Sequence, residues 1–89
     1  MPATIQTDNR HVMPSGTLVC AIQAECTVGK RVWLVRVGHS VDQLGVASWS
    51  VRFARGPRWT SPVYFPSRDA MVSHYARSFG PALGELFPV

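Results

Sequence analysis

The sequence predicts a small α+β domain, an antiparallel β-meander of three to four strands with one C-terminal helix packed on one face. Apolar and polar residues alternate over residues 17–26, 31–39 and 47–55, which is typical of half-buried strands. Apolar residues recur at three-four spacing over residues 68–79, which predicts an amphipathic helix. The 89 residues include three Trp, four Phe and two Tyr, enough for one domain with a modest core.

The first 16 residues are polar and end in the turn-forming cluster Met13-Pro14-Ser15-Gly16. We expect residues 1–16 to be a flexible N-terminal arm or at most an edge strand, and residues 17–89 to form a single α+β domain. The first strand of that domain, residues 17–26, has one fully apolar face. The turn that follows it contains Gly29, which can adopt the positive φ that a tight hairpin requires.

The second and third strands share a repeated pattern. The segments 33–37 and 49–53 both read Trp-x-Val-Arg-apolar and begin 16 residues apart. Because side chains alternate between the two faces of a strand, Trp33 and Trp49 belong to one face of their strands and Arg36 and Arg52 to the other. If the two strands are neighbours, one sheet carries two Trp and two Arg on opposite faces.

A short fourth strand is expected over residues 59–65, at a sheet edge because Pro62 lacks a backbone donor. Ser67 is a suitable N-cap for the helix over residues 68–79, and Asp69 lies in its first turn, where the helix dipole favours negative charge. Gly80 followed by Pro81 predicts that the helix stops there.

The final nine residues are strongly apolar for the end of a chain. We expect them either to pack back over the sheet as a short turn or to expose a hydrophobic anchor for a partner. The residues of this apolar anchor are Leu83, Leu86 and Phe87.

Positive charge is concentrated in the middle third of the chain. Nine basic residues, eight of them Arg, oppose five acidic ones, for a net charge of +4. Six of the basic residues lie between positions 30 and 59, where the acidic residue is Asp42, so this segment alone carries +5. Guanidinium groups bind phosphates and carboxylates bidentately and stack on aromatic rings. The candidate residues for binding a partner or nucleic acid are Arg31, Arg36, Arg52, Arg55, Arg58 and Trp59.

A purely structural interpretation of this basic set is equally compatible with the sequence. In that interpretation the Trp residues belong to the core, and the Arg residues keep the opposite sheet face in contact with water.

The sequence carries no pattern that indicates catalysis, a cofactor or a metal site. The His and Cys residues lack the two-to-four-residue spacing of a zinc knuckle. His39, Ser40 and Asp42 are near one another in the chain, but a catalytic triad converges from different elements. Cys20 and Cys26 lie six residues apart in one strand, so we expect free thiols rather than a disulfide. We therefore expect a protein that is not an enzyme.

The first 15 residues contain charged groups and no apolar run, unlike a signal peptide. No segment approaches the roughly 20 apolar residues of a membrane-spanning helix. We expect a cytoplasmic protein, in its own cell or in a host cell, with no membrane partner.

An antiparallel sheet with a basic face, followed by one helix, resembles the small DNA-binding domains at the N-terminus of phage integrases, which insert their sheet into the major groove. The resemblance covers roughly residues 30–79 and rests on element order. It implies nucleic-acid binding by the Arg-bearing sheet face and assigns no role to a single residue.

In general character the chain also resembles the small inhibitor and adaptor proteins of phages and mobile elements, of which anti-CRISPR proteins are the best known. This resemblance implies a non-catalytic module that binds a protein complex, including one that itself handles nucleic acid. The Arg residues then meet an acidic surface, and the apolar tail or Trp59 supplies a hot spot. The sequence favours this protein partner, because +4 is a modest charge for a DNA-binding domain and Lys occurs once. Monomer and homodimer both stay open.

Overall fold

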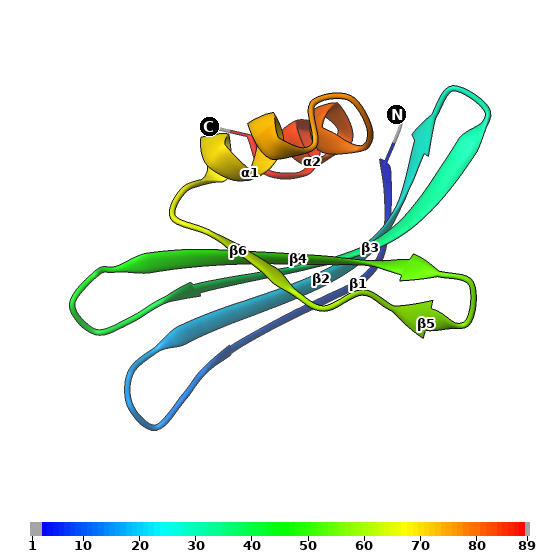
Figure 1. The fold of residues 1–89 in the computed structure, drawn as a ribbon. Coiled ribbons are helices and arrows are strands. Elements are labelled where there is room, and N and C mark those ends of the chain that lie inside the picture. Colours follow the sequence, from blue (N-terminus) through cyan, green and yellow to red (C-terminus); the bar gives the residue numbers. More distant parts are fainter. Residues whose placement is uncertain (1–2, 89) are drawn as a thin grey trace.

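The computed structural model describes residues 3–88 and shows a sheet with two short helices on one side of it (Figure 1). Within these residues the sheet has six antiparallel strands. The strands are β1 (Ala3–Val12), β2 (Leu18–Val28), β3 (Arg31–Val41), β4 (Ala47–Arg55), β5 (Arg58–Trp59) and β6 (Val63–Phe65), and the helices are α1 (Arg68–His74) and α2 (Gly80–Leu86). The predicted α+β class with an antiparallel sheet is confirmed, whereas the expected three to four strands and single helix are not.

The sheet follows the order of the chain from β1 to β4, and its last position is shared by β5 and β6 along the outer edge of β4. A single strand was expected over residues 59–65. The chain instead leaves the ladder between these two short strands, where Pro62 offers no backbone donor. The Thr60 N–H donates to the Phe53 carbonyl oxygen at 2.9 Å, and the Phe53 N–H donates to Thr60 Oγ1 at 3.1 Å.

Residues 3–12, expected to form a flexible arm or at most an edge strand, form the edge strand β1. β1 pairs along its length with β2, with a register shift between Ile5 and Thr7. Its residues are exposed except for Ala3. A polar strand of this kind can lie at an edge because one of its sides faces water and the other is satisfied by its neighbour.

The C-terminal segment contains two helices where one was predicted. The predicted N-cap is confirmed, because Ser67 accepts a hydrogen bond from the Ala70 N–H at 3.1 Å. α1 then ends after His74, and the Gly80 N–H closes a turn onto the Tyr75 carbonyl oxygen at 2.8 Å. The prediction that Gly80-Pro81 ends the helical region was wrong. Proline also fits the first turn of a helix, where its missing N–H has no partner to lose, and it begins α2 in this way.

The apolar tail packs back onto the protein, which was one of its two expected arrangements, although it does so as a helix rather than a short turn. Arg68 of α1 donates from Nη2 to the Gly84 carbonyl oxygen at 3.0 Å and from Nε to the Phe87 carbonyl oxygen. These are carbonyls at the end of α2, which have no partner within the helix. Leu83 is fully buried, and Leu86 and Phe87 are half-buried against the core. Leu83 is therefore not exposed as an anchor would be, and Leu86 and Phe87 are exposed only in part.

The core lies between the helices and the sheet face that they cover. Trp33 meets Phe53 and Phe79 with ring centroids 5.2 Å apart, and Trp49 meets Phe87 at the same distance. These Trp residues lie on the covered face, as the repeated pattern predicted, and Val35, Val37 and Val51 of the same face are buried. We call the opposite side of the sheet the open face, because neither helix covers it (Figure 1).

Candidate functional site

Two cross-strand rows of side chains define the centre of the open face. In the first row the register places Thr7, Gln23, Arg36 and Arg52 side by side across β1 to β4. In the second row, two residues further along β3 and β4, it places Asn9, Ala21, Gly38, Ser50 and Tyr64 side by side from β1 to β6. The first row supplies long polar and charged side chains, and the middle of the second row supplies small ones.

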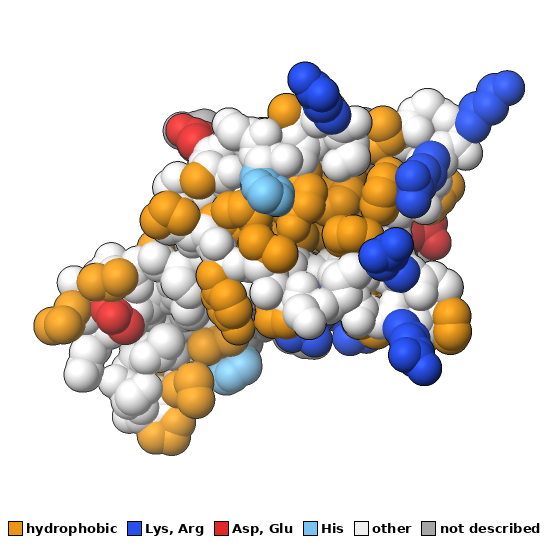
Figure 2. Space-filling view, viewed as in Figure 1, with side chains coloured by type: hydrophobic (Ala, Val, Ile, Leu, Met, Phe, Trp, Pro, Cys, Tyr) orange, Lys and Arg blue, Asp and Glu red, His pale blue; other side chains and the backbone are white. Residues whose placement is uncertain are grey.

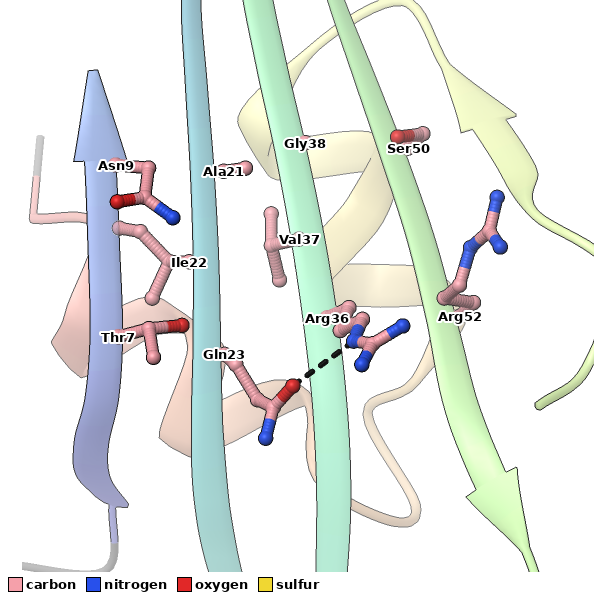
Figure 3. A pocket seen from close by; sticks show the side chains of 10 residues that line it. All are labelled: Thr7, Asn9, Ala21, Ile22, Gln23, Arg36, Val37, Gly38, Ser50 and Arg52. Atoms are coloured by element: carbon pink, nitrogen blue, oxygen red, sulfur yellow. Dashed lines mark hydrogen bonds between the residues drawn. The ribbon is translucent and has the colours of Figure 1, made fainter. Parts of the chain in front are cut away.

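This difference in side-chain size produces a shallow groove with a volume of about 500 Å³, lined by both rows (Figure 3). Figure 3 shows Arg36 and Arg52 projecting from neighbouring strands, with Gly38 and Ser50 further along the same strands. A second hollow of about 160 Å³ shares Gly38 and Ser50 with the groove and continues to Tyr64. The small residues therefore form a floor that runs from the two Arg residues to an exposed Tyr.

Arg36 is held in place from two sides. Its guanidinium carbon lies 3.9 Å from the centroid of the Trp59 ring, and its Nε donates to Gln23 Oε1 at 2.9 Å. Gln23 in turn donates to Gln6 at 2.8 Å, and Gln6 donates to Glu25 at 3.1 Å. This chain of contacts orients the guanidinium group before any ligand arrives, so less side-chain entropy is lost on binding.

Within residues 3–88, Arg52 has neither a ring nor a hydrogen-bond partner of this kind. It lies directly opposite Arg36 in the register of β3 and β4, as the repeated pattern predicted for neighbouring strands. Neither residue forms an ion pair within residues 3–88, where the ion pairs are Arg10 with Asp8 and Arg68 with Asp69. Like charges directly opposite on a sheet are destabilising. The pair is thus unfavourable in the free protein and becomes favourable when an anion lies between the two groups.

The other predicted basic residues lie at one end of the sheet, beside the β2–β3 and β4–β5 turns. Strand alternation places Arg31 on the face of Trp33 and Arg55 on the face of Phe53, and Arg58 pairs with Arg55. We call this region, with Lys30, the basic end. The guanidinium carbon of Arg31 lies 3.8 Å from the centroid of the Trp33 ring. Figure 2 shows several Lys and Arg side chains at the right of the molecule.

The predicted basic residues therefore do not form one stripe. Arg36 and Arg52 lie on the open face with Trp59, and Arg31, Arg55 and Arg58 continue around the hairpin turns to the other face. A hollow of about 450 Å³ opens between Arg31 and Arg55 beside Trp33 and Phe53. None of the basic residues from Lys30 to Arg58 has a carboxylate partner among residues 3–88.

Two features of the surface were missed by sequence reasoning. The first is the floor of small residues with Tyr64. The sequence feature that could have indicated it is Gly38 and Ser50, two small residues at open-face positions of strands that also carry large side chains. The second is an apolar end, opposite to the basic end, where exposed apolar side chains gather at the β1–β2 and β3–β4 turns (Figures 1 and 2). Its members are Val12, Met13, Leu18, Leu44 and Val46.

The residues weighed for catalysis and metal binding are separated by the fold. The His39 ring stacks on Trp49 with centroids 3.8 Å apart, on the helix-covered face, and burial lowers the pKa of this His. Ser40, the next residue, points to the open face, and Asp42 Oδ1 accepts from the N–H groups of Leu44 and Val46, both at 2.9 Å, to shape the β3–β4 turn. Within residues 3–88 no three His, Cys, Asp or Glu side chains lie close enough to hold a metal ion.

The two cysteines have free thiols and lie on the same strand. Cys26 is fully buried, and burial raises the pKa of its thiol to about 11. Cys20 is half-buried. Neither helix formed by residues 3–88 has the length and apolar character needed to cross a bilayer.

Comparisons with protein-family models, with curated proteins and with solved structures find no match to this chain.

Proposed function

We propose that this chain is a non-catalytic module that binds nucleic acid, with Arg36 and Arg52 of the open face contacting the phosphate backbone. The observation that carries the proposal is the direct opposition of these two Arg residues on a sheet face that no other element covers. The fold brings two cations together, and neither has a carboxylate partner within residues 3–88. A phosphate group is the ligand that their forked donors fit.

The surroundings of the pair support the same function. Stacking on Trp59 and the hydrogen bond to Gln23 fix Arg36, so its donors are already oriented. The small floor at Gly38 and Ser50 allows a bulky ligand to approach the strands closely. The cations of the basic end extend the positive field beyond the groove, which raises the rate of encounter with a polyanion.

A protein partner is the second candidate function, in the form of an inhibitor or adaptor that resembles anti-CRISPR proteins in character. The modest net charge of +4 and the single Lys favour a protein partner, as the sequence indicated. The apolar tail does not supply the hot spot expected for it, because Leu83 is buried. A different observation now favours it, the apolar end, where Leu44 is 85% exposed and Val12 67% exposed. Exposed apolar patches mark interaction sites in many proteins. Cytoplasmic location remains part of both proposals.

The test is a titration of labelled single-stranded and double-stranded DNA and RNA at about 50 and 200 mM salt. We compare the wild type with the Arg36→Gln, Arg52→Gln double variant. The matched control is Arg77→Gln, which removes one exposed Arg from the segment between the helices. If about four phosphates are neutralised, a single strand binds roughly 50-fold more weakly at the higher salt.

We expect the double variant to lose at least tenfold in affinity and Arg77→Gln to bind within about threefold of the wild type. Absence of binding at the lower salt contradicts the proposal, as does an equal loss in the control. In either case the apolar end becomes the surface to probe with protein partners.

A further inference from the structure

We infer that the open face binds a single strand, with one base stacked on Tyr64 and the adjoining phosphate at Arg36 and Arg52. This inference rests on the proposed function and adds the form of nucleic acid and a base-binding residue. It begins from Tyr64, a residue that the core does not use.

Tyr64 is 70% exposed although it lies in the sheet, on strand β6 opposite Ser50. The other large rings of residues 3–88 already have a partner on them. Arg31 covers Trp33, Arg36 covers Trp59, and His39 covers Trp49. Tyr64 takes part in none of the ring contacts within this part of the chain. Its ring is therefore available to stack on a flat aromatic ligand.

The spacing of the two rows fits one nucleotide. Ser50, the neighbour of Tyr64, and Arg52 are two residues apart on β4, so the rows lie roughly 7 Å apart along the strand. The groove at the Arg row and the smaller hollow at Tyr64 adjoin each other, because Gly38 and Ser50 line both. A phosphate at the Arg row can thus be joined through its sugar to a base at the Tyr64 ring.

The same arrangement disfavours a duplex. In a duplex the faces of the bases are already stacked on one another, and an aromatic platform gains no contact with them. A single strand presents those faces, and stacking on an aromatic side chain is tolerant of base identity because every base has a π-face. We therefore expect little sequence preference.

The experiment measures anisotropy of labelled oligonucleotides at about 50 mM salt. The ligands are a single strand, a duplex of the same sequence and a single strand of equal length without bases. The proteins are the wild type, Tyr64→Ala, Tyr64→Phe and the control Arg77→Gln. Because Tyr64 is exposed, we expect its variants to keep the fold, and a urea midpoint for each protein verifies this.

We expect Tyr64→Ala to weaken single-strand binding roughly 5- to 150-fold, the range seen when one stacking residue is removed. Tyr64→Phe keeps the ring and restores most of the affinity. The strand without bases binds more weakly than the intact strand, and the Ala substitution does not affect it. Arg77→Gln behaves like the wild type.

Three other outcomes overturn the inference. If the duplex binds as tightly as the single strand and Tyr64→Ala changes neither, the open face binds nucleic acid without stacking, and the proposed function stands. If the strand without bases binds as well as the intact strand, Tyr64 has no base to hold. If neither form binds in wild type, the proposed function fails together with the inference.

Discussion

Replacing Arg52 with Thr is expected to stabilise the free protein and to weaken its binding to nucleic acid. Arg52 faces Arg36 across β3 and β4 and has no ion-pair partner within residues 3–88. Directly opposed like charges cost about 0.2–1 kcal/mol. Thr also suits a strand, so the substitution keeps the strand propensity of this position.

We therefore expect the free energy of unfolding to rise by about 0.5 kcal/mol, or the melting temperature by about 2–4 °C for a domain of this size. The gain depends on salt, because the Debye length falls from about 10 Å at 0.1 M to about 3 Å at 1 M. At the higher salt the repulsion in the wild type is screened, and the two proteins become equally stable. Affinity for a single strand falls at the same time, since one phosphate contact is lost.

Urea unfolding followed by Trp fluorescence at about 50 mM and 1 M salt measures this effect. The control is a double-mutant cycle with Arg36→Thr. Without Arg36 there is no repulsion to relieve, so Arg52→Thr is then close to neutral. A loss of stability at low salt refutes the reasoning, as does a gain that survives in 1 M salt or in the absence of Arg36.

Three further predictions concern the core and its pH dependence. Gly80→Ala should lower the free energy of unfolding by about 1–3 kcal/mol in urea melts, because an added Cβ would lie 2.4 Å from a backbone oxygen. The control is Gly84→Ala, where the atom nearest to an added Cβ is a side-chain atom at 3.4 Å. This substitution should have little effect on stability. Leu83→Ala should cost about 2–5 kcal/mol because the side chain is fully buried, and an equal loss for Leu44→Ala, 85% exposed, would contradict the packing described above. Burial lowers the pKa of His39 below 6.5 in the folded protein, so the unfolded state binds protons first and stability should fall as pH drops below that value. The urea midpoints measured at about pH 7.5 and pH 5 should differ less in His39→Phe than in the wild type. A pH dependence that is the same in both proteins would refute the role of His39.

Local patterns predicted a large part of the fold. The period-two alternation placed Trp33 and Trp49 on the covered face and Arg36 and Arg52 on the open one, and the register confirms both. Gly29 adopts a φ of 61° in the hairpin turn where a positive φ was expected. Ser67 caps α1 as its residue type indicated. In each case the information lies within a few residues of chain, where sterics and local hydrogen bonds decide the conformation.

Other features depended on contacts that no local pattern contains. Gly80-Pro81 suits the end of one helix or the start of another, and the close packing of Gly80 against α1 selects the second. Residues 3–12 are polar, and they become a strand because β2 offers them a free edge. The apolar character of the tail is compatible with a packed tail and with an exposed one. The packed tail is selected by a contact distant in sequence, the hydrogen bond from Arg68 to the carbonyl oxygen of Phe87, 19 residues further on.

The sequence by itself determined the class of fold, the faces of the central strands and the concentration of positive charge between residues 30 and 59. Only the tertiary structure decided how that charge is arranged. Strand alternation and the two hairpin turns divide the basic residues between the open face and the basic end, because adjacent positions of a strand point in opposite directions and a turn brings distant positions together. The groove beside Arg36 and Arg52, with the smaller hollow at Tyr64 that adjoins it, exists for the same reason. Its residues come from different strands, and the pairing register alone makes them neighbours.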